Sequence, residues 1–344
     1  MPVLLRPRDP GTVTDWHLVH LGGFATGGAP LILTEAAAVT PEGRISPWDA
    51  GLWDEGHVAA WRRVVDFVHA RGSRIGVQLA HAGRKGSAWP PFSPQSGTVP
   101  AREGGWEPVG PTTEPFEGYA APRALAEDEV AAVVAAFGNA ARLAVDAGFD
   151  TVEVHGAHGY LLHQFRSPLV NTRTDRYGGD DAGRDRLTLE VVDAVRAAVP
   201  DSMPVLLRVS ATDWSAEAPG GVEGDLVRTV ELARRAAERG VDLVDVSSGG
   251  NLAKPDIPMG PGYQTGFAER VRREAGVATG AVGMITEPHQ AEHVLRSGQA
   301  DAVLLARGAL ADPRWWHRAA VALAAEGAVS WPPQYARVSD RRLY

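Results

Sequence analysis

The 344-residue chain contains no cysteine, which excludes disulfide bonds, thiolate metal ligands and a cysteine nucleophile. Positive charge is also in the minority, because 34 lysines and arginines stand against 42 aspartates and glutamates. This balance argues against a nucleic-acid surface or a polybasic membrane patch. The chain shows no apolar run long enough to span a bilayer, and "MPVLLRPRDPG" lacks the features of a signal peptide. We therefore expect a cytoplasmic protein.

Short apolar runs alternate with stretches of helical periodicity along the whole chain. Continuous apolar runs, rather than alternating ones, are typical of a parallel sheet whose outer face is covered by helices. The predicted strands lie in 31–39, 75–83, 151–159, 205–211, 243–250, 278–285 and 302–310. The predicted helices between them lie in 55–72, 127–148, 184–199, 223–240 and 287–298.

This order predicts one α/β domain over residues 1–344, and its size favours a (β/α)8 TIM barrel. Only seven strands are apparent, and 12–29 is predicted to be a helix that precedes the first of them. The first barrel strand is therefore missing or substituted, with "MPVLL" as the available segment. The irregular segment 84–123 is expected to be an active-site loop, and 331–344 a C-terminal tail.

Polar side chains stand at the ends of these strands, where a barrel would gather them at one mouth. They are Glu35, Gln78, His81, His155, His158, Arg208, Asp213, Ser247, Ser248 and Arg307. A single polar residue at a strand end is more often a helix cap or a loop anchor.

The segment "HGAHGY" (155–160) allows three interpretations: a metal site, an anion or carbonyl clamp, or histidines that bind backbone carbonyls. Glu153 and His81 are possible further ligands for a metal. The absence of an H-E-x-x-H helix, of cysteine and of paired carboxylates disfavours that interpretation. Tyr160 favours the second, because two imidazoles and a phenol suit polarising a carbonyl and supplying a proton.

Two segments near the C-terminus suggest a phosphate site. "GAVGMI" (280–285) and "LLARGAL" (304–310) follow the positions of the last two barrel strands, where such folds bind phosphate. Glycine allows close backbone approach, and Arg307 can add a bidentate contact. The alternative is that these glycines serve ordinary turns.

Ordered blocks from about residue 11 to residue 337 identify a resemblance. They include "TDWHLVHLG", "LTEAAAVTPEGRISPWDAGLW", "IGVQLAHAGRK", "AGFDTVEVHGAHGYLLHQFRSPLVNTRTDRYGG", "RVSATDW", "DLVDVSSGG", "PGYQ", "ATGAVGMIT" and "WPPQYAR". The chain resembles the old yellow enzyme family, most closely its bacterial thermophilic-like or xenobiotic reductase branch. The resemblance implies a (β/α)8 barrel that binds FMN, accepts hydride from NADPH or NADH, and reduces activated alkenes such as enones, enals, maleimides and nitroalkenes.

The resemblance also implies roles for individual residues toward the substrate. His155 and His158 match the pair that binds the carbonyl or nitro oxygen of the substrate, and Tyr160 matches the proton donor to the α-carbon. Lys85 resembles a lysine near the entrance of the site. Arg337 resembles an arginine that reaches a neighbouring subunit, which implies a homodimer or homotetramer.

A second group of residues matches the flavin site of the family. Gln78 and Arg208 would face the pyrimidine edge of FMN, where a guanidinium stabilises the reduced ring. Ala36 would lie against the isoalloxazine. The residues expected around the phosphate are Gly283, Met284, Ala306 and Arg307. No metal is implied.

The chain departs from the family at its N-terminus, where the family has Pro-Met-Cys-Gln-Tyr and this sequence has "PVLLR" (2–6). Codons for Met-Cys-Gln-Tyr, shifted by two nucleotides, encode Met-Pro-Val-Leu when GTG starts translation, so a shifted reading frame is one hypothesis. A substitute strand around Val3 and Leu4 is the other. Both hypotheses imply an opened barrel, which leaves backbone groups of the neighbouring strands unpaired and is expected to weaken FMN binding.

Four functions follow from these patterns. The first is an FMN-dependent NAD(P)H ene-reductase, and the second is a flavin-dependent desaturase or oxidase of a biosynthetic pathway. The third is an N-terminally truncated remnant without cofactor. The fourth, a metal-dependent barrel hydrolase, is disfavoured by the composition of the site.

Overall fold

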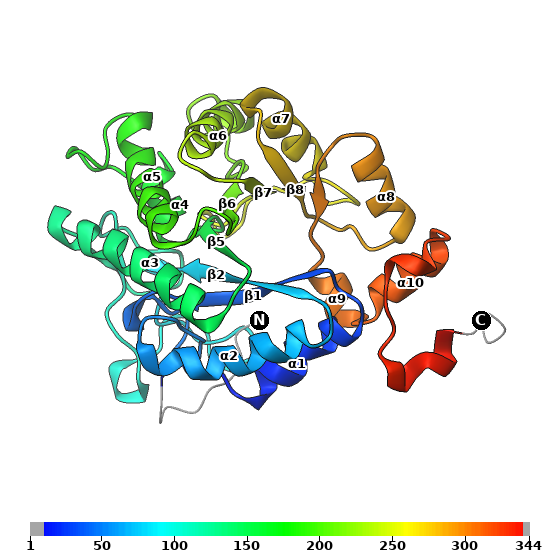
Figure 1. Ribbon diagram of the computed structural model, residues 1–344. Helices are drawn as coiled ribbons and strands as arrows, with labels where there is room; N and C mark the ends of the chain where they lie inside the picture. The colour runs from blue at the N-terminus through cyan, green and yellow to red at the C-terminus, as the bar shows by residue number, and fades with distance from the viewer. Residues whose placement is uncertain (1–9, 340–344) are drawn as a thin grey trace.

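The computed structural model describes residues 10–339, so the substitute strand predicted around Val3 and Leu4 lies outside the described residues. One parallel sheet of seven strands curls around an open centre (Figure 1). The strands follow one another in chain order, which is the order that repeated right-handed crossovers produce. They are β1 (Leu31–Ala38), β2 (Arg74–Ala80), β5 (Thr151–Gly156), β6 (Val205–Ser210), β7 (Leu243–Ser247), β8 (Ala278–Ala281) and β9 (Ala302–Val303).

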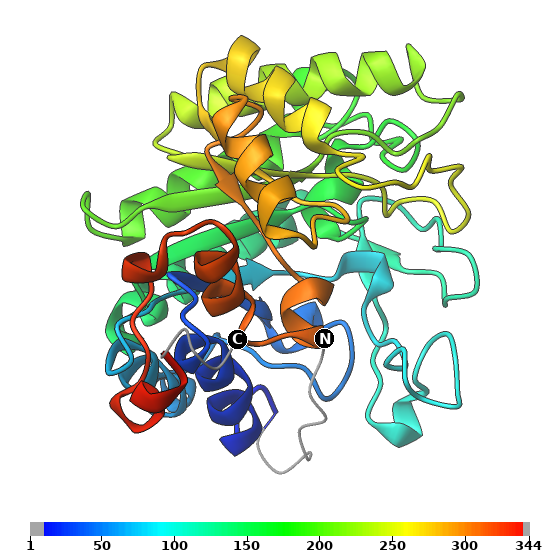
Figure 2. The same cartoon turned by 90° about the vertical axis from the view of Figure 1, so that its right-hand side faces the viewer.

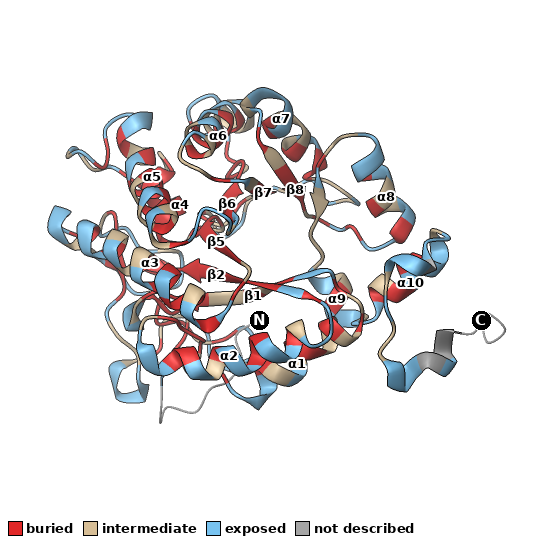
Figure 3. Cartoon of the chain, viewed as in Figure 1, coloured by how far each residue is buried: buried red, intermediate tan, exposed pale blue. Residues whose placement is uncertain are grey.

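Helices connect consecutive strands and cover the outer face of the sheet (Figure 1). Figure 3 shows that their buried sides face the strands and their exposed sides face outward. The longer helices are α1 (Asp15–Thr26), α2 (Glu55–His69), α3 (Glu127–Ala147), α5 (Asp181–Ala198), α6 (Gly221–Ala237), α7 (Thr265–Ala275), α8 (Pro288–Arg296) and α10 (Trp315–Ala322). The shorter α4 (Leu161–Arg166) and α9 (Arg307–Ala311) follow β5 and β9.

Helix α3 illustrates how the sequence specifies this packing. Val130, Val133, Phe137 and Ala144 recur at helical spacing and are buried, and Gly148 ends the helix with a left-handed φ of 90°. By length and composition this helix is also apolar enough to cross a membrane, contrary to the expectation that no such run exists. Here it packs between α2 and α5, which explains its apolar character.

The predicted strands and helices are confirmed with some differences in extent. Each of the seven predicted runs contains a strand, but in 302–310 the strand covers only Ala302–Val303. The chain then turns into α9, so most of that run is loop and helix. Helices α7 and α10 were not predicted, because each interrupts its apolar residues with charged or aromatic ones.

The expected eight-stranded barrel is not what the described residues form. Strands β1 and β9 are the two edges of the sheet and do not pair with each other. Helix α1 leads into β1, but no strand precedes α1 within residues 10–339. The result is a curled sheet of seven strands with an open slot between its edges.

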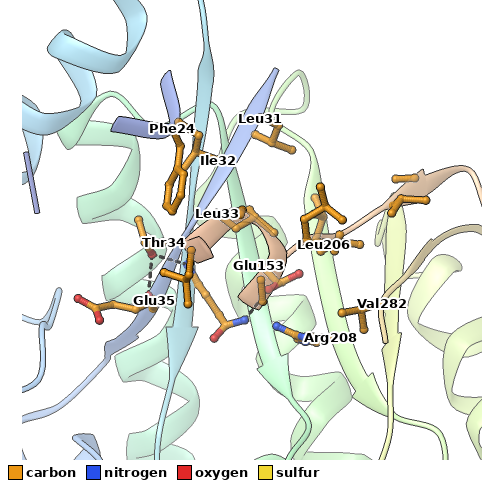
Figure 4. Close-up of a pocket in the computed structure, with 18 of the residues that line it drawn as sticks. Phe24, Leu31, Ile32, Leu33, Thr34, Glu35, Glu153, Leu206, Arg208 and Val282 are labelled. Carbon is orange, nitrogen blue, oxygen red and sulfur yellow. Dashed lines mark hydrogen bonds between the residues drawn. The ribbon is translucent and has the colours of Figure 1, made fainter. Parts of the chain in front are cut away.

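The slot is lined by apolar side chains from both edges and from the helices beside it. Leu31 and Leu33 come from β1, Phe24 from α1, and Val303 from β9. Leu31 is 42 % exposed, which is unusual for an apolar residue within a barrel strand. Figure 4 shows Phe24, Leu31 and Leu33 beside this space. The slot has the position that one further parallel strand would occupy in a closed barrel.

The predicted active-site loop 84–123 lies at one end of the molecule, in cyan in Figure 2. It contains the short helical turn Ala101–Glu103 and the two-residue strands β3 (Val109–Gly110) and β4 (Arg123–Ala124), which pair with each other. Its first residues form a second turn, Gly83–Lys85, directly after β2. The loop is therefore structured and attached at the carboxyl end of the sheet, where barrel enzymes place their sites.

Candidate active site

A cavity of about 900 Å³ extends from the carboxyl ends of the strands to the slot between β1 and β9. Its size lies in the range of small-molecule sites. Most of the predicted catalytic and flavin-binding residues line it together: Ala36, Gln78, His155, His158, Tyr160, Arg208 and Ala306. Lys85, Gly283, Met284, Arg307 and Arg337 are not among the residues that line it.

The two histidines are presented by a tight turn after β5. His158 and Gly159 both have positive φ, 59° and 70°. A side chain at position 159 would meet the Gly250 carbonyl oxygen at 2.1 Å, so only glycine fits this close approach to the β7 loop. His155 thus lies near the end of β5, and the sequence G-x-H-G-Y folds into the turn after it, which brings His158 and Tyr160 beside His155.

The histidines contact each other as well as the cavity. His158 Nδ1 lies 3.4 Å from His155 Nε2, and His158 Nε2 lies 2.8 Å from Ser247 Oγ. Both ring nitrogens of His158 therefore have protein partners. A substrate oxygen would bind His158 by replacing one of these contacts, a detail that the sequence pattern alone does not predict.

Burial keeps both imidazoles neutral. It lowers the pKa of His155 and of His158 well below the ordinary value, and the positive charge of Arg208 lowers both further. A neutral imidazole still has one N–H to donate. The pair can therefore polarise an oxygen without itself carrying charge.

Tyr160 stands beside the pair, with its ring centroid 5.1 Å from that of His155. Burial raises the pKa of its phenol above the ordinary value, and the charge of Asp49 raises it further. The hydroxyl thus holds its proton at neutral pH. This is the state that a proton donor to a strongly basic carbon needs.

Lys85 was predicted near the entrance of the site, but the structure places it between two loops. Its Nζ donates to the carbonyl oxygens of His158 at 2.8 Å and of Gly250 at 2.9 Å. It also lies 4.5 Å from the centre of the Phe116 ring. Burial lowers the pKa of Lys85 to about 8, with Arg84 adding to the effect. Its position indicates that it joins the β5 and β7 loops.

Gln164 holds the histidine turn from below. Its Nε2 donates to the carbonyls of Ala82 and Gly159, and its Oε1 accepts from the backbone N–H of Arg84. The side chain is fully buried. It therefore joins the β2 loop to the β5 turn. Sequence reasoning missed it because all three partners are backbone groups, which leave no signature in the sequence.

Gln78 and Arg208 come from β2 and β6, the two strands beside β5, and His155 pairs with Arg208 in the register. Gln78 Nε2 donates to Glu153 Oε1 at 2.6 Å. Arg208 Nε lies 2.9 Å from Asp245 Oδ2, an ion-pair distance without the alignment of a hydrogen bond. Figure 4 shows Arg208 and Glu153 projecting from neighbouring strands into the same space. Asp245 was not predicted as a site residue, and Glu153 was considered only as a possible ligand in the disfavoured metal interpretation, although a glutamate within the buried run "DTVEV" was a signal.

The predicted phosphate residues lie at the ends of β8 and β9. Gly283 has φ 127°, and a side chain there would meet Gln264 Nε2 at 2.8 Å. Met284 is 41 % exposed, and Arg307 is the exposed first residue of α9. A Cβ at Gly308 would lie 3.8 Å from the Ile285 carbonyl oxygen, so the two loops are adjacent.

Several polar strand-end residues anchor loops instead. Glu35 contacts His17 at 2.8 Å, and His81 Nδ1 accepts from the Gly83 N–H. Asp213 accepts from Ser167 and Asn251. Arg337 is exposed in the helical turn Pro333–Ser339, and its role toward a neighbouring subunit stays a prediction. In the part of the chain that the structure describes, no three His, Asp or Glu side chains form a group suited to a metal ion.

The donor set of the cavity fits a flavin. Arg208 Nε and His155 Nδ1 are buried and have no hydrogen-bond partner within residues 10–339. Such orphaned groups indicate a missing ligand more often than a stable state. A guanidinium and an amide, together with two imidazoles and a phenol in the same cavity, fit an oxidoreductase site for a planar cofactor and a polar acceptor.

Comparison with known proteins agrees with this class. A model of the NADH:flavin oxidoreductase / NADH oxidase family matches residues 2–326, and the chain belongs to this family of oxidoreductases, whose cofactors are FMN and a nicotinamide hydride donor. The resemblance to the old yellow enzyme family is thereby confirmed. The chain is 44 % identical over 314 residues to an NADPH dehydrogenase of Geobacillus sp. (strain WCH70), covering 91 % of this chain and 85 % of that protein. It is 40 % identical over 328 residues to an NADPH dehydrogenase of Bacillus subtilis (strain 168), covering 95 % and 89 %.

Two solved structures support the fold. Morphinone reductase is 29 % identical, with a TM-score of 0.75 over 94 % of this chain and 85 % of that one. A 2-naphthoyl-CoA reductase is 23 % identical, with a TM-score of 0.82 over 95 % of this chain and 49 % of that one, so this chain spans about half of it. The second likeness concerns the fold alone.

Proposed function

We propose that this chain is an FMN-dependent ene-reductase, which uses hydride from NADPH or NADH to reduce the C=C bond of enones, enals, maleimides or nitroalkenes. The observation that carries the proposal is that one cavity gathers two sets of polar groups. Gln78 and Arg208 line it together with His155, His158 and Tyr160. Flavin-dependent NAD(P)H oxidoreduction is the activity of the family. The proposal adds that the electron acceptor is an activated alkene.

FMN, when bound, supplies the two-electron hydride chemistry that no side chain provides. The residues that would hold its ring are Ala36, Gln78 and Arg208, while Gly283, Met284, Ala306 and Arg307 would surround its phosphate. Arg208 would place its positive charge beside the pyrimidine edge of a bound flavin and so favour the negative charge that reduction brings. The positive charge is fixed in place before the reaction and therefore needs no reorganisation.

On the substrate side, His155 and His158 donate hydrogen bonds to the carbonyl or nitro oxygen. Because they are neutral, each donates through its one N–H, and the developing enolate-like charge is stabilised by hydrogen bonds and not by an ion pair. Tyr160 gives its proton to the α-carbon as hydride arrives at the β-carbon. Its phenol recovers the proton from solvent after the product leaves.

The experiment separates the two half-reactions under anaerobic conditions. FMN-loaded protein should lose its visible flavin band with NADPH and regain it with 2-cyclohexen-1-one. The variants His155→Asn and His158→Asn should be reduced by NADPH at the wild-type rate, but their reoxidation by the enone should slow roughly 100-fold. His289→Asn, an exposed histidine of α8, is the matched control.

Reoxidation that is unchanged in both site variants would refute the proposed role of the histidine pair. Flavin that is reduced but never reoxidised by any activated alkene would refute the ene-reductase proposal itself. We further propose a cytoplasmic homodimer or homotetramer in which Arg337 reaches the neighbouring site. Light scattering of the wild type, with enone kinetics of Arg337→Ala, tests this part.

A further inference from the structure

The buried carboxyl of Glu153 has no role in the mechanism above. It lies on β5 with no exposed surface, two residues before His155. Its Oε1 accepts from Gln78, while Oε2 is buried and has no hydrogen-bond partner among residues 10–339. An ionised carboxylate with one unpartnered oxygen is costly in such a place, so the group favours a bound proton.

The charged groups that face Glu153 come from the next two strands. In the sheet register Gln78 pairs with Glu153, His155 with Arg208, and Arg208 with Asp245. Arg208 has its ion-pair distance to Asp245, whereas Glu153 lies opposite Leu206 in the register and feels both charges through space: Asp245 raises its pKa and Arg208 lowers it. If both carboxyls were ionised, the trio would carry a net negative charge, and one proton makes it neutral.

Asp245 and Glu153 are not equivalent toward that proton. Asp245 has the direct ion-pair distance to Arg208, which favours its ionised form, although burial raises its pKa. Burial and the charge of Asp245 raise the pKa of Glu153, Arg208 and the hydrogen bond from Gln78 oppose the rise, and the net pKa is about 7. Glu153 is thus the member of the trio that changes protonation near neutral pH.

One other carboxyl of the cavity also titrates near neutral pH, because burial raises the pKa of Asp49 to about 6. Glu35 is bonded to His17, and Asp49 accepts from Ser46 on the side of the loop after β1. His155 and His158 remain neutral, as their lowered pKa values indicate.

We propose that Glu153 is a proton reservoir coupled to Arg208, and that it takes up one proton from solvent when negative charge arrives at the ring edge facing the guanidinium. The inference rests on the proposed function, which places the flavin against Arg208. Hydride from the nicotinamide would bring two electrons and one proton to the ring, and the negative charge left there would offset the positive charge that Glu153 feels from Arg208. Above pH 7, where Glu153 is ionised, its Oε2 would then bind one proton from solvent, which offsets the charge added to the ring, and would release it when the hydride leaves for the acceptor.

The first test needs no cofactor. Infrared difference spectra of the full-length chain, recorded across pH before FMN is added, should show a protonated carboxyl band that disappears with a midpoint near pH 7. The band should be absent in Glu153→Gln and present in Glu238→Gln, an exposed glutamate used as the matched control. In Asp245→Asn the midpoint should move to lower pH, because the charge that raises the pKa of Glu153 is gone. Burial also raises the pKa of Asp49 and of Asp185 to about 6, so the band of Glu153 is the part of the signal that Glu153→Gln removes. Spectra of the wild type and of Glu153→Gln that do not differ overturn the proposal.

The second test measures the coupling in FMN-loaded protein. A two-electron reduction that takes up one proton changes the midpoint potential by about 30 mV per pH unit, and one that takes up two changes it by about 59 mV. Above pH 7 the wild type should follow the steeper slope, and Glu153→Gln the shallower one. Equal slopes overturn the coupling, even if the infrared band locates the proton on Glu153.

The failures of the two proposals are distinguishable. A chain that binds no FMN overturns the proposed function and the coupling together, while the infrared band still decides which carboxyl titrates. A chain that binds and turns over FMN with equal slopes overturns only the role of Glu153. If Glu153→Gln does not fold, Asp245→Asn decides instead. Its infrared midpoint, and the pH above which its midpoint potential follows the slope of about 59 mV per pH unit, should both move to lower pH; no movement of either overturns the proposal.

Discussion

Replacing Gln164 with methionine should destabilise the protein and loosen the turn that carries the histidine pair. Methionine has nearly the same length, so the change removes hydrogen bonds with little change in volume. Three bonds are lost: those to the Ala82 carbonyl at 3.0 Å, the Gly159 carbonyl at 2.7 Å and the Arg84 N–H at 3.1 Å. Each buried backbone group left without a partner costs about 1–3 kcal/mol. The expected loss in free energy of unfolding is therefore roughly 3–6 kcal/mol, allowing for partial relaxation.

Urea unfolding followed by tryptophan fluorescence measures this difference. The control is Gln95→Met, an exposed glutamine in the 84–123 loop whose change should stay within about 0.5 kcal/mol. The turn should also hold His158 less firmly, so the variant should bind enone more weakly while FMN remains bound. A destabilisation below about 1 kcal/mol would show that water or a rearranged backbone satisfies the three groups. The argument for Gln164 as the support of the turn would then be wrong.

Three further predictions concern the same region. Gly250→Ala should lower the free energy of unfolding, measured in urea, by more than about 2 kcal/mol. The reason is that Gly250 has a φ of 119° and that a Cβ there would meet the His158 carbonyl carbon at 2.0 Å. In the control Gly260→Ala the new Cβ meets nothing within 4 Å, so the free energy of unfolding should not change. The folded-state pKa of Lys85, about 8, lies below its unfolded value of 10.5, so the unfolded chain binds more protons between these values and stability should rise with pH there. Unfolding free energies at pH 7.5 and 10 should show this rise in Lys254→Met and lack it in Lys85→Met; the same rise in both would contradict the assignment. Ala36→Leu should abolish FMN retention after desalting without unfolding the protein, and wild-type retention would show that Ala36 does not face the ring.

The parts of the fold that depend on local periodicity could be predicted from the sequence. Helix α3 follows from the spacing of Val130, Val133 and Phe137, and β5 from its continuous apolar run. Helix α7 could not be predicted as readily, because only Ala268, Val271 and Thr265 are buried among charged residues. The open edge between β1 and β9 was expected from the missing strand, but its apolar lining depends on packing by α1 and α10.

The candidate site likewise contains a part that the sequence predicts and a part that only the folded structure shows. His155, His158 and Tyr160 share one short turn, so their proximity is a local property that the sequence contains. The trio of Glu153, Arg208 and Asp245 comes from three strands, and only the register brings it together. The contacts of Lys85 are to backbone carbonyls, which have no signature in the sequence.

The central claim is that the cavity of this seven-stranded sheet holds a flavin against Arg208, and the most direct test is a stoichiometric FMN titration. Purified chain is mixed with excess FMN and desalted, and the visible spectrum gives the flavin retained per chain. We predict one FMN per chain for the wild type and loss of retention in Arg208→Ala. Colourless wild-type protein, or equal retention by Arg208→Ala, would contradict the claim.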